Sequence, residues 1–351
     1  MEEYYILYIL NKVRQLTGLI ESFQYFRWTR RYSRPGSFEI KTIGSRENAA
    51  LLQIGNYLWK SDDEEIGIIE HVELNQGDKE TITASGKFAT AILGRRIIWD
   101  TEILNGDIGA CVQQLLNNNV INPFDINRKI PYITYINNIL GIDIKSQVSF
   151  KNLLDTIAQM LDMADVGIKT VFAPKTGMLT VSLYQGNASS SVFSREYENL
   201  ISQSFIQSKT DYADTALIGG EGEGYDRIFT AIIGASGEDR REIFVDADDL
   251  RSENFSTDYI DALLQRGQTK LAERVMINAL DATINPRGNL AYKTDYDLGQ
   301  IVTVHARRWG VALATRITEI TESYDENGLS LDIVFGRGLV TLGQKLKQEG
   351  V

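Results

Sequence analysis

The sequence holds few of the residues on which disulfides, metal sites and acid–base catalysis usually depend. Its 351 residues include one cysteine, Cys111, two histidines, His71 and His305, and five prolines. A single cysteine excludes an intramolecular disulfide, and two isolated histidines remove most schemes that need a His pair for metal binding or proton transfer. We therefore predict no catalytic residue, no metal and no cofactor, and a chain that folds in a cytoplasm.

Positive charge and long hydrophobic runs are also scarce. Lys and Arg total 36 against 47 Asp and Glu, which gives a formal net charge of −11. A protein that binds nucleic acid by neutralising its phosphates needs a basic face, so the net negative charge argues against such binding. The apolar run near the N-terminus follows acidic residues and is far too short to span a bilayer. It predicts a first strand and no membrane insertion.

The length of the chain allows two or three domains. Short apolar stretches separated by turns at intervals of about ten residues predict an antiparallel β domain, sandwich or barrel, over residues 1–105. Similar patterning predicts a second β domain over 196–351, with a helical insertion at about 256–281 that contains a helix over about 257–280. Thr257 is a candidate cap for that helix. The fold class is mainly β, with two related barrel-like antiparallel domains.

Between these domains the periodicity becomes helical. Apolar residues recur at helical spacing from Asp107, and a second helix is predicted over 150–164, with Ser149 as its cap and Gly167 after its end. Two predicted strands follow, so a small inserted α/β domain is expected over 106–195. Ser189 to Ser191 is predicted to be a linker.

Three turns have recognisable chemistry. Pro35 and Gly36 suit the two central positions of a type II turn. The stretches NQGD at 75–78 and DENG at 325–328 are typical of hairpin turns. The acidic cluster VDADDL lacks the Gly and the closing Glu of a calcium loop, which favours a solvated turn.

The stretch LIGGEGEGYDRIF at 217–229 looks like a phosphate-binding loop but departs from one. No Lys follows it, Glu221 and Glu223 place negative charge where a phosphate would lie, and a strand pattern follows where a helix is needed. Its glycines are spaced G-x-G-x-G: Gly220, Gly222 and Gly224. We interpret the stretch as a bend into a strand of the second β domain, with the two glutamates and Arg227 at a subunit surface.

The most basic segment is RWTRRYSR, where Trp28 and Tyr32 alternate with four arginines: Arg27, Arg30, Arg31 and Arg34. Arginines among aromatics can bind single-stranded nucleic acid, but in an acidic protein we favour a salt-bridged strand or a subunit contact. Arg95 and Arg96 form a second small patch. We expect some of these arginines to pair across subunits with SDDEE at 61–65.

One part of the sequence resembles another in pattern. The stretch from Gly55 to Gly86 and the stretch from Gly299 to Gly336 each run through a Gly-polar start, a strand, a charged turn, a longer strand, an acidic turn and an alternating strand. A duplication and the general likeness of β meanders both fit this pattern. If it is a duplication, three copies of the chain would close a ring of near sixfold character.

Several segments together resemble a known family. They are WTRRYSRPGSFEI, AALLQIGNYLWKSD with GIIEHVEL, SGKFATAILGRRIIW, and GGEGEGYDR with GEDRREIFVDADDL. In this order they resemble the siphophage tail hub proteins, the tail-associated (Tal-like, Gp37-like) proteins of the tail tip, which prophages also encode. The resemblance runs over essentially the whole chain. It implies a homotrimeric hub whose two β domains per subunit form a pseudo-hexameric ring around the DNA channel.

The resemblance also implies a location and partners. The protein is expected in the virion tail, after synthesis in the bacterial cytoplasm. Its expected partners are its own copies, the distal tail protein or tail tube ring, the tape measure protein and tip or fibre proteins, while DNA passes without specific binding. Candidates for structural or interface roles are Arg27, Arg30, Arg31, Pro35, Gly36, Gly55, Gly86, Arg95, Arg96, Gly220, Gly222, Gly224, Arg227, Arg240 and Arg241.

An enzymatic alternative remains beside the hub. Larger family members continue into a peptidase or fibre-like region, which we do not expect here because the sequence stops at Val351. The alternative function is a peptidoglycan-degrading enzyme or a carbohydrate-binding module at the tail tip. Catalytic carboxylates of a glycosidase cannot be picked out among 47 acidic residues by sequence.

Overall fold

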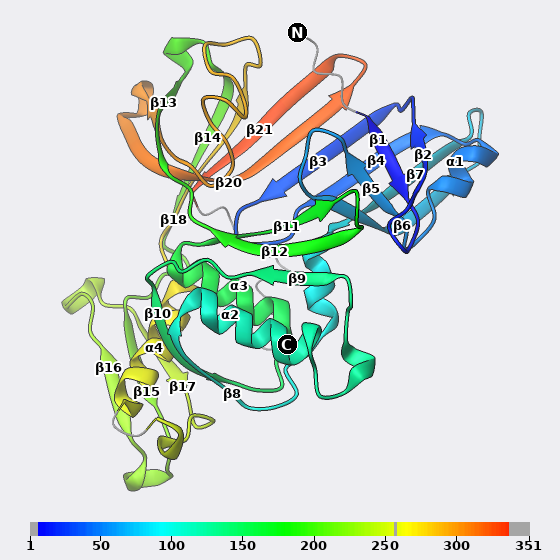
Figure 1. Ribbon diagram of the computed structural model, residues 1–351. Coiled ribbons are helices and arrows are strands. Elements are labelled where there is room, and N and C mark those ends of the chain that lie inside the picture. The colour runs from blue at the N-terminus through cyan, green and yellow to red at the C-terminus, as the bar shows by residue number, and fades with distance from the viewer. Residues whose placement is uncertain (1–5, 256–257, 337–351) are drawn as a thin grey trace.

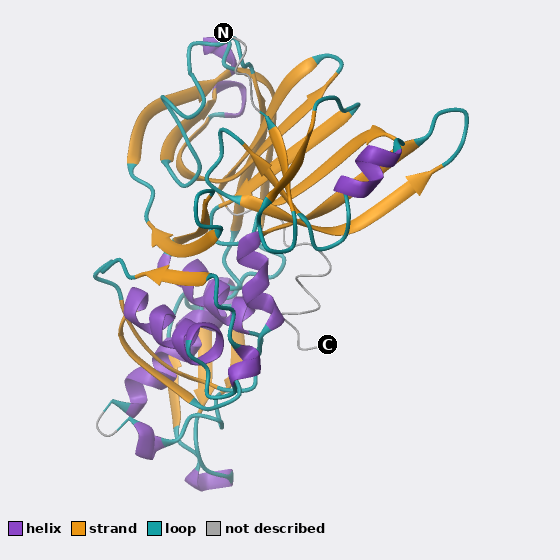
Figure 2. Cartoon of the chain, turned by 45° about the vertical axis from the view of Figure 1, so that its right-hand side comes forward, coloured by secondary structure: helices purple, strands orange, loops and turns teal. Residues whose placement is uncertain are grey.

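The computed structural model describes residues 6–255 and 258–336, and its largest feature is one long β-sheet (Figures 1 and 2). The first part of the chain builds the N-terminal β unit: β1 (Leu7–Leu10), β2 (Leu16–Ile20), β3 (Tyr25–Arg31), β4 (Ser37–Ile43), α1 (Arg46–Leu51), β5 (Tyr57–Lys60), β6 (Ile66–Asn75) and β7 (Thr81–Phe88). The C-terminal β unit contains β13 (Ala188–Ser194), β14 (Leu200–Ser208), β18 (Ile277–Ile284), β19 (Ile301–Ala306), β20 (Val311–Asp325) and β21 (Gly328–Gly336). The predicted linker at Ser189 to Ser191 is therefore wrong, because these residues lie within β13, in the irregular part between Ala188 and Val192, which both pair with β19.

The two β units share one topology. The sheet order is β3-β4-β7-β6-β5 in the first unit and β14-β18-β21-β20-β19 in the second. In both, neighbours run antiparallel, and the strands follow in the same chain order. The internal repeat suggested by the sequence is thus present in the fold.

The repeat extends to single hydrogen bonds. The N–H of Gly55 donates to the carbonyl of Ile69 at 2.8 Å, and that of Gly299 donates to Ile317 at 2.8 Å. Both glycines have positive φ, +89° and +86°, which glycine adopts without steric cost. The long strands β6 and β20 each carry a bulge directly after these isoleucines.

The last glycines of the two sequence repeats do not correspond. Gly86 stands opposite Ile69, whereas the residue opposite Ile317 is Phe335. Gly336 therefore falls one position beyond the equivalent of Gly86. Its φ of +79° marks the end of β21.

The two units join edge to edge through β3 and β20 (Figure 1). The longest path through the described strands runs β14-β18-β21-β20-β3-β4-β7-β6-β5-β1-β2, with β13 and β19 branching from it. The described strands form an open sheet and no closed barrel, which corrects the barrel-like part of our expectation. Both edges of this path, at β14 and β2, remain open.

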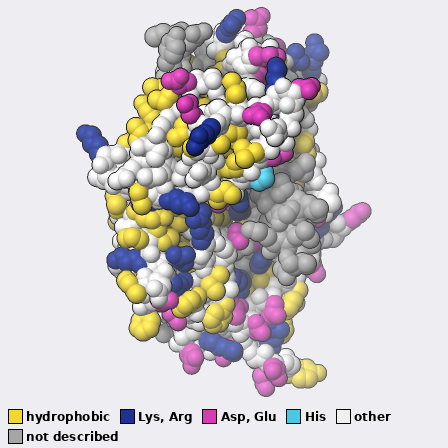
Figure 3. All heavy atoms as spheres, turned by 90° about the vertical axis from the view of Figure 1, so that its right-hand side faces the viewer, with side chains coloured by type: hydrophobic (Ala, Val, Ile, Leu, Met, Phe, Trp, Pro, Cys, Tyr) yellow, Lys and Arg dark blue, Asp and Glu magenta, His cyan; other side chains and the backbone are white. Residues whose placement is uncertain are grey.

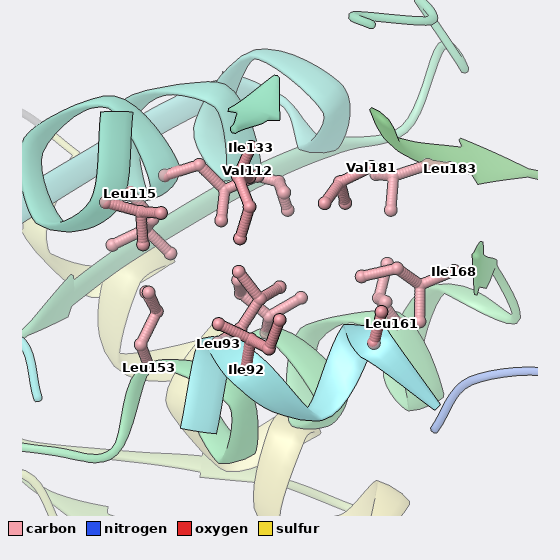
Figure 4. Close-up of a cluster of buried hydrophobic side chains, with 14 of the residues drawn as sticks. Ile92, Leu93, Val112, Leu115, Ile133, Leu153, Leu161, Ile168, Val181 and Leu183 are labelled. Carbon is pink, nitrogen blue, oxygen red and sulfur yellow. The ribbon is translucent and has the colours of Figure 1, made fainter. Parts of the chain in front are cut away.

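A small α/β unit fills the sequence between the repeats. It contains η1 (Ala89–Arg95), β8 (Glu102–Asp107), α2 (Ile108–Leu116), β9 (Ile133–Ile136), β10 (Asp143–Val148), α3 (Leu153–Ala164), β11 (Gly167–Ala173) and β12 (Met178–Tyr184). Buried aliphatic side chains from its helices and strands meet in one core (Figure 4). Asn152 caps α3 through the N–H of Asp155, and not Ser149. The left-handed residue that ends α3 is Asp165, two positions before Gly167.

A small three-stranded sheet, named the third sheet here, is inserted between β14 and β18. It contains β15 (Thr215–Gly219), β16 (Phe229–Ile232) and β17 (Glu242–Asp246) and packs on α4 (Tyr259–Ala272). The helix ends well before the predicted residue 280, because the chain becomes strand again at Ile277. The predicted cap Thr257 lies outside the described residues. Lys145 of β10 reaches this insertion through an ion pair with Asp258 at 2.8 Å.

The predicted hairpin tips at 75–78 and 325–328 are confirmed, since they connect β6 to β7 and β20 to β21. The type II turn at Pro35 and Gly36 is wrong. Gly36 does not adopt the positive φ that this turn requires at its third position. Glycine is needed there for space, because a Cβ atom would lie 2.4 Å from the carbonyl oxygen of Thr29.

Candidate functional site: a buried polar junction

Buried charge gathers where the two β units meet. Strand β3 pairs with β20 so that Arg31 stands opposite Glu319 and Phe26 opposite Tyr324. The rings of Phe26 and Tyr324 stack with centroids 5.8 Å apart, and Arg31 binds Glu319 at 2.6 Å. The seam therefore has both apolar and ionic contacts.

Arg30 forms several of the polar contacts at this seam. Its guanidinium lies 2.7 Å from the carboxylate of Asp297 and 3.6 Å from that of Asp63, and it donates to the hydroxyl of Tyr292 at 3.1 Å. Burial lowers the pKa of Arg30, but Tyr292 and the two carboxylates outweigh it and raise the pKa above its usual value. The side chain is charged at every working pH. It ties the turn after β5 to the loop before β19.

A second buried cation, Lys60, lies beside it. The side chain is fully buried and its Nζ atom lies 2.8 Å from the Glu322 carboxylate and 2.5 Å from that of Asp62. Lys293 also binds Asp62, at 3.0 Å. Lys60 and Asp62 come from the N-terminal β unit, and Glu322 and Lys293 from the C-terminal β unit. The cluster therefore crosses the seam.

Asp63 and Glu65 complete the acidic side of the junction. Asp63 accepts a hydrogen bond from the indole N–H of Trp28 at 2.9 Å. Glu65 is buried, and burial together with the charge of Asp63 raises its pKa to about 8. Its carboxyl group accepts the N–H of Thr170 from β11 at 3.2 Å. Glu65 is thus held in the neutral form at pH 7 and contacts the α/β unit.

The same arginine-rich segment reaches the α/β unit. The hydroxyl of Tyr32 donates to the carbonyl of Asp165 at 3.1 Å, and Arg34 binds Asp162 at 2.5 Å. Arg316 of β20 binds the Asp165 carboxylate at 2.5 Å. Three units therefore meet around one segment of the N-terminal β unit.

One of the arginines expected to pair with SDDEE across subunits, Arg30, meets this segment within the chain. Arg30 meets Asp63 of the SDDEE segment inside one molecule, so this pair is not available to a neighbouring copy. Arg27 differs, because it lies on the exposed face of β3 over the ring of Tyr25.

The other candidate residues lie away from the junction. Arg95 pairs with Glu70 at 3.4 Å, and Arg96 donates to the carbonyl of Arg128 at 3.0 Å. In the third sheet, Arg240 pairs with Glu242 at 2.5 Å and Arg241 donates to the carbonyl of Lys209 at 2.6 Å; Pro35 and Gly36 follow β3, while Gly55 and Gly86 belong to the repeat. The structure therefore does not bring these candidates into one site.

The glycine-rich stretch is a connection between two strands, β15 and β16, as the sequence predicts, but these strands belong to the inserted third sheet and not to the C-terminal β unit. Arg227 donates to the carbonyls of Gly219 and Gly220 and pairs with Asp246. Gly222 and Gly224 have φ of +106° and +56°. The N–H of Gly220 donates to the carbonyl of Ile228, so this backbone donor stabilises the loop and does not point at a phosphate.

Two hollows are candidates for ligand binding. One of about 540 Å³ is lined by residues that include Tyr8, Arg14, Trp59 and Lys175, and one of about 520 Å³ by residues that include Gln113 and Tyr135. Among the described residues, neither hollow has an Asp or Glu in its lining, and no cluster of three metal-ligating side chains occurs. Neither hollow offers the carboxylate pair of a glycosidase.

Sequence reasoning found the arginines of the junction but missed Lys60, Glu322, Tyr292 and Asp297. One signal was available. Ile320, Glu322 and Tyr324 alternate on one face of a strand, so a carboxylate occupies a position where burial is expected. A buried carboxylate needs a cation as its partner. That cation is Lys60, which lies 262 residues earlier in the sequence than Glu322, so the sequence does not reveal the pair.

Basic and acidic side chains are interspersed on the face of the molecule shown in Figure 3. No helix in the described part of the chain is long and apolar enough to cross a membrane.

Comparisons with known proteins place the chain among viral proteins. Residues 6–337 match the family model described as siphovirus ReqiPepy6 Gp37-like protein. No curated protein sequence matches. Three solved structures share the fold over nearly the full length of both chains: the 43 kDa tail protein of prophage MuSo2 from Shewanella oneidensis, a tail protein from Neisseria meningitidis MC58, and prophage tail protein gp18 from Listeria monocytogenes EGD-e.

Their sequences are distant from this one. The Shewanella protein has a TM-score of 0.62 at 14% identity, covering 95% of this chain and 98% of the other. The Neisseria protein has 0.59 at 11%, covering 95% and 96%. The Listeria protein has 0.59 at 12%, covering 98% of each. At these identities the likeness establishes the shared fold.

Proposed function

This chain is a phage tail protein that belongs to the siphovirus ReqiPepy6 Gp37-like protein family, and we propose that it is the structural hub of the tail tip. Three copies form a pseudo-hexameric ring around the channel through which DNA leaves the tail. The hub joins the tail tube or distal ring to the tip, and it is not an enzyme.

The duplicated β unit is the observation that carries this proposal. A chain with two like units already places two equivalent building blocks side by side, so three chains supply the six positions of a ring. The buried junction fits the same role, because Arg30 and Lys60 fix the two units against each other without a substrate site.

Partners above and below the ring belong to the same proposal. The distal tail protein or tail tube ring would contact one face, and the tape measure protein and tip or fibre proteins the other. The small third sheet stands apart from the long sheet in Figure 1 and offers a separate surface for such contacts. Arg240 and Arg241 lie directly before its strand β17, next to the exposed acidic side chains of Glu238 and Asp239.

The mass of the purified protein in solution tests the proposal. Light scattering with negative-stain images should give rings of three times 39.4 kDa, about 118 kDa. Assembly with a co-expressed distal tail protein is the second arm, since a neighbour can be required to close the ring. Monomers in both arms would contradict the hub.

The alternative of a peptidoglycan-degrading enzyme or a carbohydrate-binding module is tested separately. The protein is incubated with purified peptidoglycan, and both released fragments and sedimented protein are measured. We expect neither release nor binding. Release would identify an enzyme, and binding without release would identify a module.

A further inference from the structure

Two strands of the long sheet have open edges that match each other. Strand β14 pairs only with β18 among the described strands. In β6, the half that follows the bulge, residues 71–75, pairs only with β7, because β5 covers the half before the bulge. Figure 1 shows β14 and β6 on opposite sides of the molecule. An unpaired edge exposes backbone N–H and C=O groups that can accept another strand.

The repeat shows what covers such an edge. By strand order, β6 corresponds to β20 and β14 corresponds to β3. In the second repeat, the half of β20 after the bulge pairs antiparallel with β3. The same half of β6 is open, and the β3-equivalent strand, β14, is open too. The edge of β6 lacks a neighbour like β3, and the edge of β14 lacks a neighbour like β20, so each strand can supply what the other lacks.

The register follows from the equivalent positions on β6 and β20. Ile69 corresponds to Ile317, because each binds the glycine that opens its repeat and stands at the bulge. Counting five residues onward, Leu74 corresponds to Glu322. Glu322 stands opposite Trp28 of β3.

The same counting works on β3 and β14. Trp28 stands opposite Phe38 in β4, and Phe38 opposite Gly86. Phe205 stands opposite Leu280 in β18, and Leu280 opposite Phe335. As established for the repeat, Gly86 and Phe335 are equivalent, so Phe205 corresponds to Trp28.

We propose that β6 of one copy pairs antiparallel with β14 of the next copy, with Leu74 opposite Phe205 and His71 opposite Ser208. This inference rests on the proposed ring, and it specifies the interface that forms it. The pairing of β6 with β14 between copies then repeats the pairing of β20 with β3 within each copy. The sheet then runs from subunit to subunit by one repeated contact.

The side chains at the two edges fit this pairing. Leu74 is 66% exposed although it stands opposite the buried Ile82, on the core face of the sheet. Phe205 stands opposite the buried Leu280 and packs against the core of the C-terminal β unit. In the proposed register these two apolar side chains meet on the same face, as Phe26 and Tyr324 do at the internal joint.

Charge also matches at the end of the joint. Within the chain, the N–H of Tyr32 donates to the carbonyl of Thr318 at 3.0 Å. The equivalent residues between copies are Lys209 and Glu70. Their side chains carry opposite charge and stand at neighbouring positions, which favours this register over slipped ones.

Such a contact is heterologous, because β6 of each copy meets β14 of another. A heterologous contact forms a closed ring or an open filament, depending on the rotation between copies. A two-fold dimer does not use it. The prediction is therefore a head-to-tail arrangement.

Disulfide trapping tests the register directly. The internal pair Thr29 and Thr321 has its hydroxyl oxygens 3.1 Å apart, and the equivalent positions between copies are Ile206 and Glu73. We expect the double variant Glu73→Cys/Ile206→Cys to form covalent dimers and trimers under mild oxidation. The control is Glu73→Cys/Ser202→Cys, which moves one cysteine about 13 Å along the same face, beyond disulfide reach. Native Cys111 is buried and gives the wild-type background.

The outcomes separate this inference from the proposed function. At least ten-fold more cross-linked product in the Ile206 pair than in the Ser202 pair supports the register. A threefold particle in which neither pair cross-links, or both do equally, overturns the strand pairing and leaves the ring standing. Protein that forms neither particle nor cross-link at any concentration, with or without the distal tail protein, contradicts both.

Discussion

Single buried side chains decide how the two β units are held. Lys60 and Glu322 come from different repeats and form an ion pair of 2.8 Å away from solvent. Removing one partner of such a pair leaves an uncompensated charge, whereas removing both leaves apolar surface. The junction therefore depends on matched partners more than on the number of ion pairs.

The first prediction concerns this pair. Lys60→Met should lower the free energy of unfolding by about 3–5 kcal/mol, because Glu322 is left buried without its cation. The double variant Lys60→Met/Glu322→Leu should recover most of that loss. Urea unfolding measures both. Lys169→Met is the matched control, since its pair with Glu64 is partly exposed and should be worth less than about 1 kcal/mol.

An unchanged midpoint for Lys60→Met alone would contradict the buried junction. A double variant that is less stable than either single variant would show that Lys60 and Glu322 do not act as a pair.

The second prediction concerns pH. Burial raises the pKa of Glu65 from 4.5 to about 8, so the folded protein holds a proton that the unfolded chain releases near pH 4.5. The stabilisation of the fold by this bound proton is complete below pH 4.5 and is lost as the pH rises toward 8. Glu65→Gln removes this loss, so its stability relative to the wild type should increase by up to about 1.4 kcal/mol for each pH unit between 4.5 and 8.

Thermal or urea unfolding at several pH values measures the slope. Glu64→Gln is the control, because it removes a neighbouring carboxyl group that is exposed and not buried. A wild type and a Glu65→Gln variant with parallel pH profiles would show that Glu65 is ionised in the fold.

At the scale of elements, the N-terminal β unit depends on close backbone packing beside a bulge. Gly86 lies against β6 where the strand bends, and a Cβ atom added there would meet the carbonyl oxygen of Ile68 at 1.7 Å. Backbone atoms at this distance cannot yield without disrupting the β6–β7 ladder. The glycine is required for the approach of two strands, and not for a positive φ.

The third prediction follows from this contact. Gly86→Ala should lower the free energy of unfolding by at least about 2 kcal/mol, since the new methyl group overlaps backbone. Gly77→Ala, at the tip of the same hairpin, is the control, because its Cβ atom would have no neighbour within 4 Å. Denaturant midpoints compare the two. Equal midpoints would show that β6 and β7 are farther apart than described.

At the scale of the whole molecule, net charge bears on the proposed channel. The chain carries a net charge of −11, and three copies would carry about three times as much. A negative surface repels the phosphates of duplex DNA, so the ring should let DNA slide without sticking. Three of the four arginines in the segment RWTRRYSR, namely Arg30, Arg31 and Arg34, are engaged in ion pairs.

The fourth prediction is therefore an absence of DNA binding. Duplex DNA should migrate unchanged in the presence of micromolar protein at both about 50 and about 200 mM salt. Binding through phosphate contacts weakens strongly over this range of salt concentration. A mobility-shift gel with the assembled particle measures this. Retardation at 50 mM salt that disappears at 200 mM would show a basic channel surface and contradict the repulsive one.

The sequence determined the local structure and the class of the protein. Alternating apolar residues, turn signals and helical periodicity predict most elements, because neighbours in the chain fix them. The family likewise follows from segments of sequence. The likeness between the stretches that begin at Gly55 and Gly299 is also visible in the sequence, but only the shared strand order identifies it as a repeat. Local mistakes, such as Ser149 for Asn152 as a cap, arise because several nearby polar residues compete for one position.

Only the tertiary structure decided which distant residues meet. The pairing of β3 with β20 and the contacts of Arg30 with Asp297 and of Lys60 with Glu322 all join positions more than a hundred residues apart. Strand pairing depends on hydrogen bonds that every residue type offers, so its partners leave little trace in the sequence. The reach of each charged side chain is likewise set by packing in three dimensions.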